Sequence, residues 1–118
     1  MIEKLDTRFE TLSLKFVEYF NAKDALSIGE LLHEDFKLFD PKLKWIKGKS
    51  NVIDVLSSQF SEIQNVKYDI LRSYQDKETT ILEFKIILDD LILYGVDFIE
   101  WENEKMTELR CYYNPTDI

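Results

Sequence analysis

The sequence is poor in the residues that mark disulfides, metal centres and flexible linkers. It has one cysteine, one histidine, three glycines and two prolines in 118 residues. Cys111 alone cannot form a disulfide within the chain, and one histidine with one cysteine is too few for a transition-metal ligand set. No glycine-rich phosphate loop is present either. We therefore expect no disulfide, no metal and no cofactor, and a single domain over residues 1–118.

Long apolar runs and an excess of basic residues are also absent. No apolar run approaches the roughly 20 residues that a membrane-spanning helix needs, and Met1–Asp6 lacks the basic and apolar regions of a secretory signal. Acidic residues outnumber basic ones by 23 to 15, for a formal net charge of -8. Such a chain lacks the basic surface that nucleic acid or an anionic membrane attracts. We expect a cytoplasmic protein that binds neither.

The apolar content suffices for a core, at 45% hydrophobic and 14% aromatic residues, and its spacing predicts three helices. Apolar residues recur every three or four positions over residues 5–20, which is typical of an amphipathic helix. Asp24 is placed to cap a second helix that ends near His33, and Ser50 to cap a third that runs to Ile63. The three apolar stripes are Leu5, Phe9, Leu12, Phe16, Tyr19 and Phe20; Ala25, Ile28, Leu31 and Leu32; and Ile53, Leu56, Phe60 and Ile63.

Strand spacing takes over in the second half of the chain. A short strand is expected earlier, at residues 36–40, where Pro41 stops it, and residues 45–46 lead into the turn before the third helix. From residue 66 the apolar period is two, with short polar breaks that are typical of an antiparallel meander. The expected strands are residues 66–75, 79–89, 91–102 and 105–114. Helices followed by strands indicate an α+β fold with the helices on one sheet face.

Residue parity in the last two strands indicates which side chains face the helices. Leu109, Cys111 and Tyr113 share one face, which we expect to be the interior. In the preceding strand Asp97 shares a face with Ile99, and both faces of that strand carry large apolar groups. A sheet with two apolar faces has its outer side covered as well. We therefore predict a homodimer through the outer sheet face.

Five segments carry a resemblance to a known family. They are FNAKD at residues 20–24, LHEDF at 32–36, WIKGK at 45–49, VDFIEW at 96–101 and KMTELR at 105–110. In this order they resemble the SnoaL-like branch of the NTF2-like superfamily over nearly the whole chain. The resemblance implies a cone-shaped α+β barrel, with N-terminal helices packed against a strongly curved, mostly antiparallel sheet that encloses a pocket. Such proteins include ketosteroid isomerases, polyketide cyclases, dehydratases and non-catalytic binding domains.

The resemblance to the isomerases implies two site residues. Asp40, followed by Pro41, falls where the isomerases carry their catalytic Asp-Pro, and Asp97 falls where they carry the buried aspartic acid of the oxyanion hole. Leu109, Cys111 and Tyr113 fall on their pocket-lining positions. One position departs from the pattern, because Phe16 replaces the tyrosine that completes their oxyanion hole.

The chemistry of the pair can also be argued from the residues. Asp40, at a strand end, can stay ionised and accept a proton from carbon next to a carbonyl. Asp97, between Val96 and Phe98, would be desolvated, which raises its pKa and lets it donate a hydrogen bond to a developing oxyanion. Simpler interpretations stay open. Asp-Pro is a common turn opener, and Asp97 could face solvent or bond a tyrosine.

The expected pocket walls are core residues with one free side. They are Phe16, Tyr19, Phe39, Trp45, Leu56, Phe60, Phe84, Ile99, Leu109, Cys111 and Tyr113. Two functions are therefore open. The first is a cofactor-independent isomerase, cyclase or dehydratase that acts on a small apolar carbonyl compound through Asp40 and Asp97. The alternative is a non-catalytic ligand-binding or dimerisation module. An enzyme needs an open pocket with both carboxyls pointing in.

Overall fold

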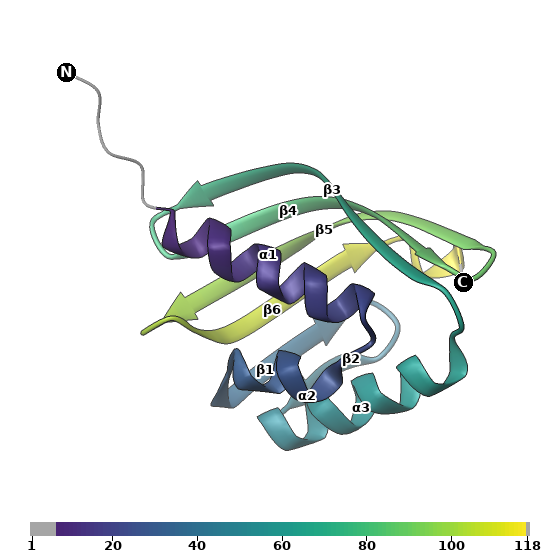
Figure 1. The fold of residues 1–118 in the computed structure, drawn as a ribbon, viewed down its shortest axis with the longest axis horizontal. Helices are drawn as coiled ribbons and strands as arrows, with labels where there is room; N and C mark the ends of the chain where they lie inside the picture. The colour runs from purple at the N-terminus through teal and green to yellow at the C-terminus, as the bar shows by residue number, and fades with distance from the viewer. Residues whose placement is uncertain (1–6, 118) are drawn as a thin grey trace.

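The structure of the protein is a computed structural model that describes residues 7–117, with three helices set against a six-stranded sheet (Figure 1). The helices are α1 (Arg8–Asn21), α2 (Ala25–Glu30) and α3 (Lys49–Glu62), with a short 3-10 turn, η1 (Pro115–Asp117), at the end. The strands are β1 (Leu32–Asp40), β2 (Lys44–Lys47), β3 (Val66–Asp76), β4 (Thr79–Leu88), β5 (Leu91–Glu102) and β6 (Lys105–Tyr113). The expected α+β architecture, with a meander formed by β3 to β6, is confirmed.

The sheet is open and mixed. Its strand order is β2-β1-β6-β5-β4-β3, and every pairing is antiparallel except that of β1 with β6, which is parallel. Because β2 and β3 lie at opposite edges and do not pair, the sheet is not closed into a barrel, and the expected helices packed against a mostly antiparallel sheet are confirmed. The sheet and the helices still enclose the core between them, with α1 lying across the sheet and α3 packed beside β1 and β2 (Figure 1).

The parallel pairing explains where the predicted elements differ from the observed ones. The second helix ends at Glu30, and Leu32 and His33 already belong to β1. The backbone N–H of Met106 bonds to the carbonyl of Leu31 at 2.7 Å, and Leu32 pairs with Met106. The pairing with β6 therefore overrides the helical spacing of Leu31 and Leu32, a tertiary effect that local propensity does not contain.

Smaller differences concern β2, α3 and the first helix. Residues 44–47 form a strand that pairs with β1, whereas residues 45–46 were expected only to lead into a turn. α3 begins one residue before the expected cap at Ser50, because Gly48, with φ at 93°, is the N-cap. The first helix is described from Arg8, and Leu5 lies outside the described residues. None of the described helices is long and apolar enough to span a membrane.

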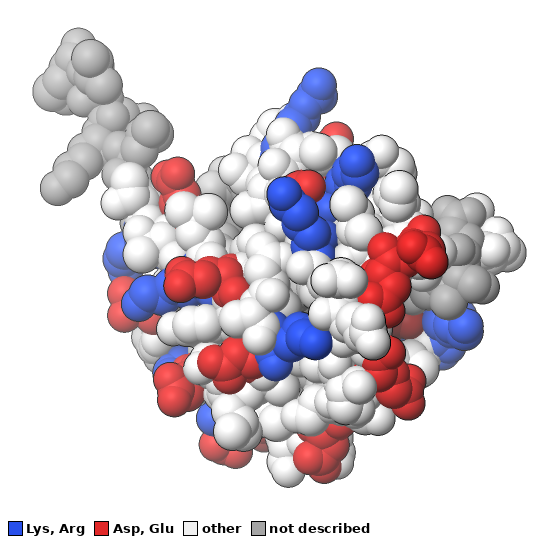
Figure 2. Space-filling view, turned by 45° about the vertical axis from the view of Figure 1, so that its right-hand side comes forward, with Lys and Arg blue, Asp and Glu red and all other residues white. Residues whose placement is uncertain are grey.

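The core lies where alternate strand residues meet the helices. Phe36, Leu82, Phe84, Ile99 and Met106 are almost completely buried on the inner face of the sheet. Charged side chains other than Asp97 lie mostly outside, and on the side shown in Figure 2 acidic and basic groups are interspersed among uncharged ones. The excess of acidic residues is therefore not gathered into one patch on that side.

Gly95 marks the closest approach within the sheet. A Cβ added at this position would lie 2.2 Å from the carbonyl oxygen of Tyr112 and 2.7 Å from Cζ of Phe84. Neither the strand backbone nor the fully buried ring can move away easily, because a close-packed interior leaves no room. The missing side chain of Gly95 therefore leaves room for the ring of Phe84, its partner on the neighbouring strand β4.

Substituting Gly95 with Ala should destabilise the protein by about 1–3 kcal/mol or more, because overpacking of a close-packed site costs this much. Gly29→Ala is the matched control, since its Cβ meets the flexible side chain of Ile53, with Cδ1 at 2.5 Å and Cγ1 at 3.1 Å, and not backbone or a packed ring, and Ala favours a helix by about 1 kcal/mol. Urea denaturation of both variants measures the difference. Equal losses of stability would contradict the assigned role of Gly95.

Candidate functional site

A cavity of about 560 Å³ lies between the helices and the inner face of the sheet. Its walls are mainly aliphatic and aromatic, and they come from all three helices and from β1 and β3 to β6. Among the residues expected to line it, the structure brings nine together there. They are Phe16, Asp40, Leu56, Phe60, Phe84, Asp97, Leu109, Cys111 and Tyr113.

Four of the expected wall residues do not line the cavity. Phe39 and Trp45 lie on the outer sheet face, with ring centroids 5.2 Å apart. The reason is alternation, because Leu38 and Asp40 face inward and the residue between them must face outward. Ile99 is fully buried in the core away from the cavity, and Tyr19 packs half-buried against the core.

Asp97 is the most unusual side chain of the cavity wall. It lies in the middle of β5, opposite Cys111 of β6, and is only 3% exposed. Its Oδ2 accepts a hydrogen bond from the hydroxyl of Tyr68 at 2.6 Å. Its Oδ1 has no hydrogen-bond partner among the described residues. A buried carboxyl oxygen without a partner is costly, and native structures contain few of them.

Burial raises the pKa of Asp97 to about 6. The low dielectric of the interior disfavours the charged carboxylate, and this effect is larger than the others. The hydroxyl of Tyr68 and the thiol of Cys111 favour the charged form and lower the pKa, while the negative charge of Asp40 raises it. Near neutral pH the group can therefore both hold and release a proton.

Tyr68, in β3, is the site residue that the sequence analysis missed. Its ring is 2% exposed and packs against Phe16, Phe20 and Phe84, with centroids 6.1, 5.6 and 5.4 Å away. Burial, together with the charge of Asp97, raises the pKa of its phenol well above the usual value. The alternation of apolar Tyr68 and Ile70 with charged Lys67 and Asp69 was the available signal that Tyr68 faces inward.

Asp40 closes the end of β1 at the border of the cavity. The hydroxyl of Tyr113 donates to its Oδ1 at 2.9 Å and lies 3.1 Å from its Oδ2. Its Oδ2 also accepts the backbone N–H groups of Lys42 and Leu43, each at 2.9 Å. Asp40 therefore holds the turn after β1 and lines the cavity at the same time, so the turn interpretation and the site interpretation are compatible.

The remaining polar groups are less suited to chemistry. Burial, with the nearby charges of Asp97 and Asp40, raises the pKa of the Cys111 thiol far above its usual range, so the thiol stays protonated and is a poor nucleophile. His33 is an exposed residue of β1, and its Nδ1 accepts the backbone N–H of Asp35 at 3.1 Å. Within residues 7–117 no group of three His, Cys, Asp or Glu side chains is placed to hold a metal ion.

The cavity thus combines apolar walls with two carboxyl groups in different environments. One carboxyl is buried and readily protonated, and the other is partly exposed and accepts backbone hydrogen bonds. Two groups with such different surroundings can divide the work of a general acid and a general base. The phenols of Tyr68 and Tyr113 each donate to one carboxyl, which orients both of them.

Comparison with known proteins identifies relatives of this fold. A family model described as the SnoaL-like domain matches residues 14–109. No curated protein matches the chain. An NTF2-like protein of unknown function from Cytophaga hutchinsonii superposes with a TM-score of 0.81 at 18% identity, covering 98% of this chain and 96% of that one.

Two further solved structures have names that indicate an activity. A proposed ketosteroid isomerase from Kribbella flavida gives a TM-score of 0.77 at 18% identity, covering 91% of this chain and 78% of that one. A proposed SnoaL-like polyketide cyclase from Shewanella putrefaciens gives 0.83 at 13% identity, covering 97% and 84%. At these identities the similarity establishes the fold.

Replacing Asp97 with Asn should remove a pH-dependent loss of stability. The pKa of Asp97 is about 6 when folded and 3.8 as a free side chain, so the folded state binds the proton more tightly. The free energy of unfolding therefore falls as the pH rises from about 4 through 6. Two pKa units correspond to about 3 kcal/mol.

Relative to the wild type, the free energy of unfolding of Asp97→Asn should increase by up to about 3 kcal/mol between pH 4 and pH 8. Urea denaturation at both pH values measures this gain. Asp54→Asn, at an exposed position of α3, is the control and should follow the wild-type profile. Parallel profiles for Asp97→Asn and the wild type would contradict the raised pKa.

Proposed function

Because the chain belongs to the SnoaL-like domain family, we propose that it binds a small apolar carbonyl compound in the cavity and transfers protons on it through Asp97 and Asp40. One observation carries this proposal. Asp97 is buried in an apolar cavity, one of its carboxyl oxygens has no hydrogen-bond partner within residues 7–117, and its pKa is raised to about 6. A carboxyl with these properties is suited to donate a hydrogen bond to a ligand oxygen.

The bound compound itself favours the neutral form of Asp97. An apolar ligand displaces water from the cavity, which increases the desolvation of the carboxyl and raises its pKa further. The protonated Asp97 then donates to the carbonyl oxygen of the ligand. Donation to an oxygen on which negative charge develops stabilises the transition state more than the ground state.

Asp40 is the proton acceptor in this proposal. Its carboxylate takes a proton from the carbon next to the carbonyl, the C–H electron pair forms a C=C bond, and the carbonyl π pair moves onto the oxygen, which accepts a hydrogen bond from Asp97 as an enolate. Return of the proton from Asp40 to another carbon of a conjugated enolate isomerises the compound, whereas transfer of that proton to a departing β-hydroxyl group releases water and dehydrates it. The names of the Kribbella and Shewanella proteins, an isomerase and a cyclase, support this class of reaction.

Binding of the proposed ligand class should depend on pH through Asp97. 2-Acetylnaphthalene offers one carbonyl acceptor on an apolar body, and 2-ethylnaphthalene offers the body alone. We expect the Kd of the ketone to rise about tenfold per pH unit above pH 6, since only the protonated fraction of Asp97 binds it. The Kd of the hydrocarbon should stay constant, and Asp97→Asn should bind the ketone equally at all pH values. A pH-independent ketone Kd in the wild type would refute the donor role.

The base is tested with the same ketone in heavy water. If Asp40 removes a proton from the acetyl methyl group, deuterium enters that group at a rate that NMR measures. Asp40→Asn should lower this rate by about 10²–10⁴, the usual contribution of a general base. The amide of Asn can still accept the backbone bonds of the turn, so a folding defect is not expected. Undiminished exchange in this variant would exclude Asp40 as the base.

A dimerisation module is the second candidate function, and the outer sheet face favours it. Four aromatic rings form a row there, with neighbouring centroids 5.2 to 6.0 Å apart. Two cations lie over its ends, Lys37 over Trp45 at 4.8 Å and Arg110 over Phe98 at 5.3 Å. The row, which we call the aromatic row, consists of Trp45, Phe39, Tyr112 and Phe98.

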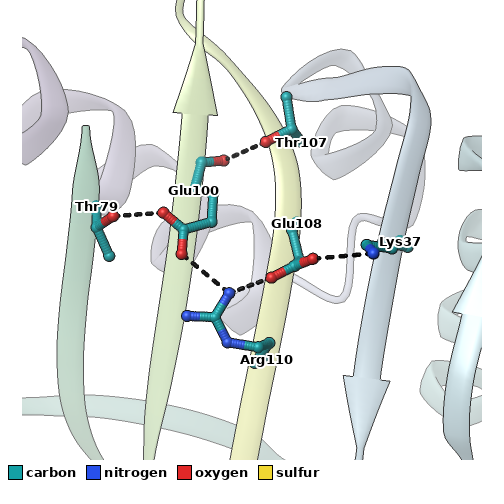
Figure 3. A network of polar contacts seen from close by, with 6 residues as sticks. All are labelled: Lys37, Thr79, Glu100, Thr107, Glu108 and Arg110. Atoms are coloured by element: carbon teal, nitrogen blue, oxygen red, sulfur yellow. Dashed lines mark hydrogen bonds and ion pairs between the residues drawn. The ribbon is translucent and has the colours of Figure 1, made fainter.

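The charges beside the aromatic row neutralise one another. Figure 3 shows them joined across β1, β6 and β5, with Lys37 paired to Glu108 at 3.3 Å and Arg110 paired to Glu108 and to Glu100, the latter at 2.9 Å. Two cations and two anions leave no net charge here, although the whole chain carries -8. A second copy of the chain would therefore meet little repulsion at this face, and we propose that it docks there as a symmetric homodimer.

Tyr112→Glu should convert this dimer to a monomer, because it places an unpaired charge within the aromatic row. Sedimentation velocity measures the change, and Leu26→Glu, at an exposed position of α2, is the control that should stay dimeric. A monomeric wild type would refute this interface without affecting the proposed chemistry of the cavity.

A further inference from the structure

We propose that Tyr68 is a positioning residue that determines which oxygen of Asp97 carries the acid proton. Its hydroxyl donates to Oδ2 at 2.6 Å, while Oδ1 has no partner among the described residues. The phenol thereby reserves Oδ2 as an acceptor and leaves Oδ1 as the oxygen that holds the proton. This inference rests on the proposed function, because it explains how the neutral carboxyl presents its donor to a ligand.

The argument follows from the hydrogens available between the two groups. A phenol has one hydrogen, and in the structure it points to Oδ2. If neutral Asp97 carried its proton on Oδ2, two hydrogens would meet between the same pair of oxygens, and the phenol would have to turn away. A buried phenol that loses its acceptor is costly. The proton is therefore held on Oδ1.

The surroundings of Tyr68 hold its ring, and therefore its hydroxyl oxygen, in place beside Oδ2 of Asp97. Three phenylalanine rings pack around its ring, with the edge-to-face geometry of Phe16 and Phe20 at interplanar angles of 81° and 74°. Its backbone is held as well, because Asn21 at the end of α1 accepts the N–H of Tyr68 at 2.6 Å and donates to its carbonyl at 3.4 Å. The ring of Tyr68 is thus held by the phenylalanine rings, and its main chain is held by the side chain of Asn21.

The other titratable groups that act on Asp97 do not replace this donor. The Cys111 thiol is a weak donor on the opposite strand, and Asp40 contributes only its negative charge. Tyr113 donates to Asp40 instead. Tyr68 is therefore the donor that orients the buried carboxyl. Its own hydroxyl is used in this bond and does not donate to the ligand.

Removing the hydroxyl of Tyr68 should raise the pKa of Asp97 and lower the affinity for a ketone. The bond from Tyr68 stabilises the charged carboxylate, so Tyr68→Phe should raise the pKa of Asp97 above 6. The neutral carboxyl should nevertheless bind a ketone less well, because the proton is no longer confined to Oδ1. Simple damage to the fold would weaken binding without raising the pKa.

Infrared spectroscopy and NMR of the ligand-free protein test the inference directly. At pH 5 the C=O stretch of protonated Asp97, assigned by its loss in Asp97→Asn, should move to higher wavenumber in Tyr68→Phe, because the carbonyl loses its donor. Carboxyl-carbon NMR should show the raised pKa, and 2-acetylnaphthalene should bind about five- to tenfold more weakly at pH 5. Tyr74→Phe, which alters a tyrosine 54% exposed, is the control and should leave all three values unchanged.

The outcomes separate this inference from the proposed function. An unchanged band and an unchanged pKa in Tyr68→Phe would overturn the inference, whether or not the ketone binds. A shifted band with no ketone binding by the wild type would uphold the positioning role and refute the proposed ligand class. If Tyr68→Phe does not fold, 3-fluorotyrosine at position 68 replaces it. Its more acidic hydroxyl should lower both the wavenumber and the pKa, and no change in either would overturn the inference.

Discussion

The parallel pairing of β1 with β6 is the constraint on which the rest of the structure depends. It joins the N-terminal half of the chain to the meander, and it places Leu38 beside Leu109 and Phe39 beside Arg110. Because of this register, Asp40 ends next to Tyr113, while Asp97 lies one strand further on, opposite Cys111. The two carboxyls therefore reach the same cavity from segments that are far apart in the sequence. Without this pairing, β1 would separate from the meander together with β2 and α3, which pack against it.

Much of the fold and part of the cavity wall followed from the sequence, and the failures have definite physical causes. Parity in β6 was sufficient to place Leu109, Cys111 and Tyr113, because a strand has only two faces. By the same rule Phe39 and Asp40 cannot both line one pocket, since neighbouring residues in a strand point to opposite faces. Trp45 could not be placed without β2, whose four residues are too few for a periodic pattern. Tyr68 and Asp97 are 29 residues apart, and no local spacing reveals that they form a pair.

The cavity concentrates the features that cost the protein stability. A cavity of about 560 Å³ lacks packing contacts, and beside it lies the buried carboxyl of Asp97, one oxygen of which has no hydrogen-bond partner in the part of the chain that the structure describes. Sites where a chain departs from close packing and from complete hydrogen bonding are commonly functional sites. The location of these costs therefore agrees with the proposal that the cavity, rather than a surface loop, is where the protein acts.

The open sheet also bears on how the protein behaves when it is concentrated. An unpaired edge strand is a template for endless strand addition, the first step toward fibres. One edge here is β2, which is short and carries Lys44 and Lys47, and the other is β3, whose ladder is interrupted between Ile70 and Arg72. Short length, lysines and irregular ladders all discourage further strands from joining. Growth through the edges is thus discouraged at both ends, and the proposed docking of a second copy on the outer sheet face would close after two copies.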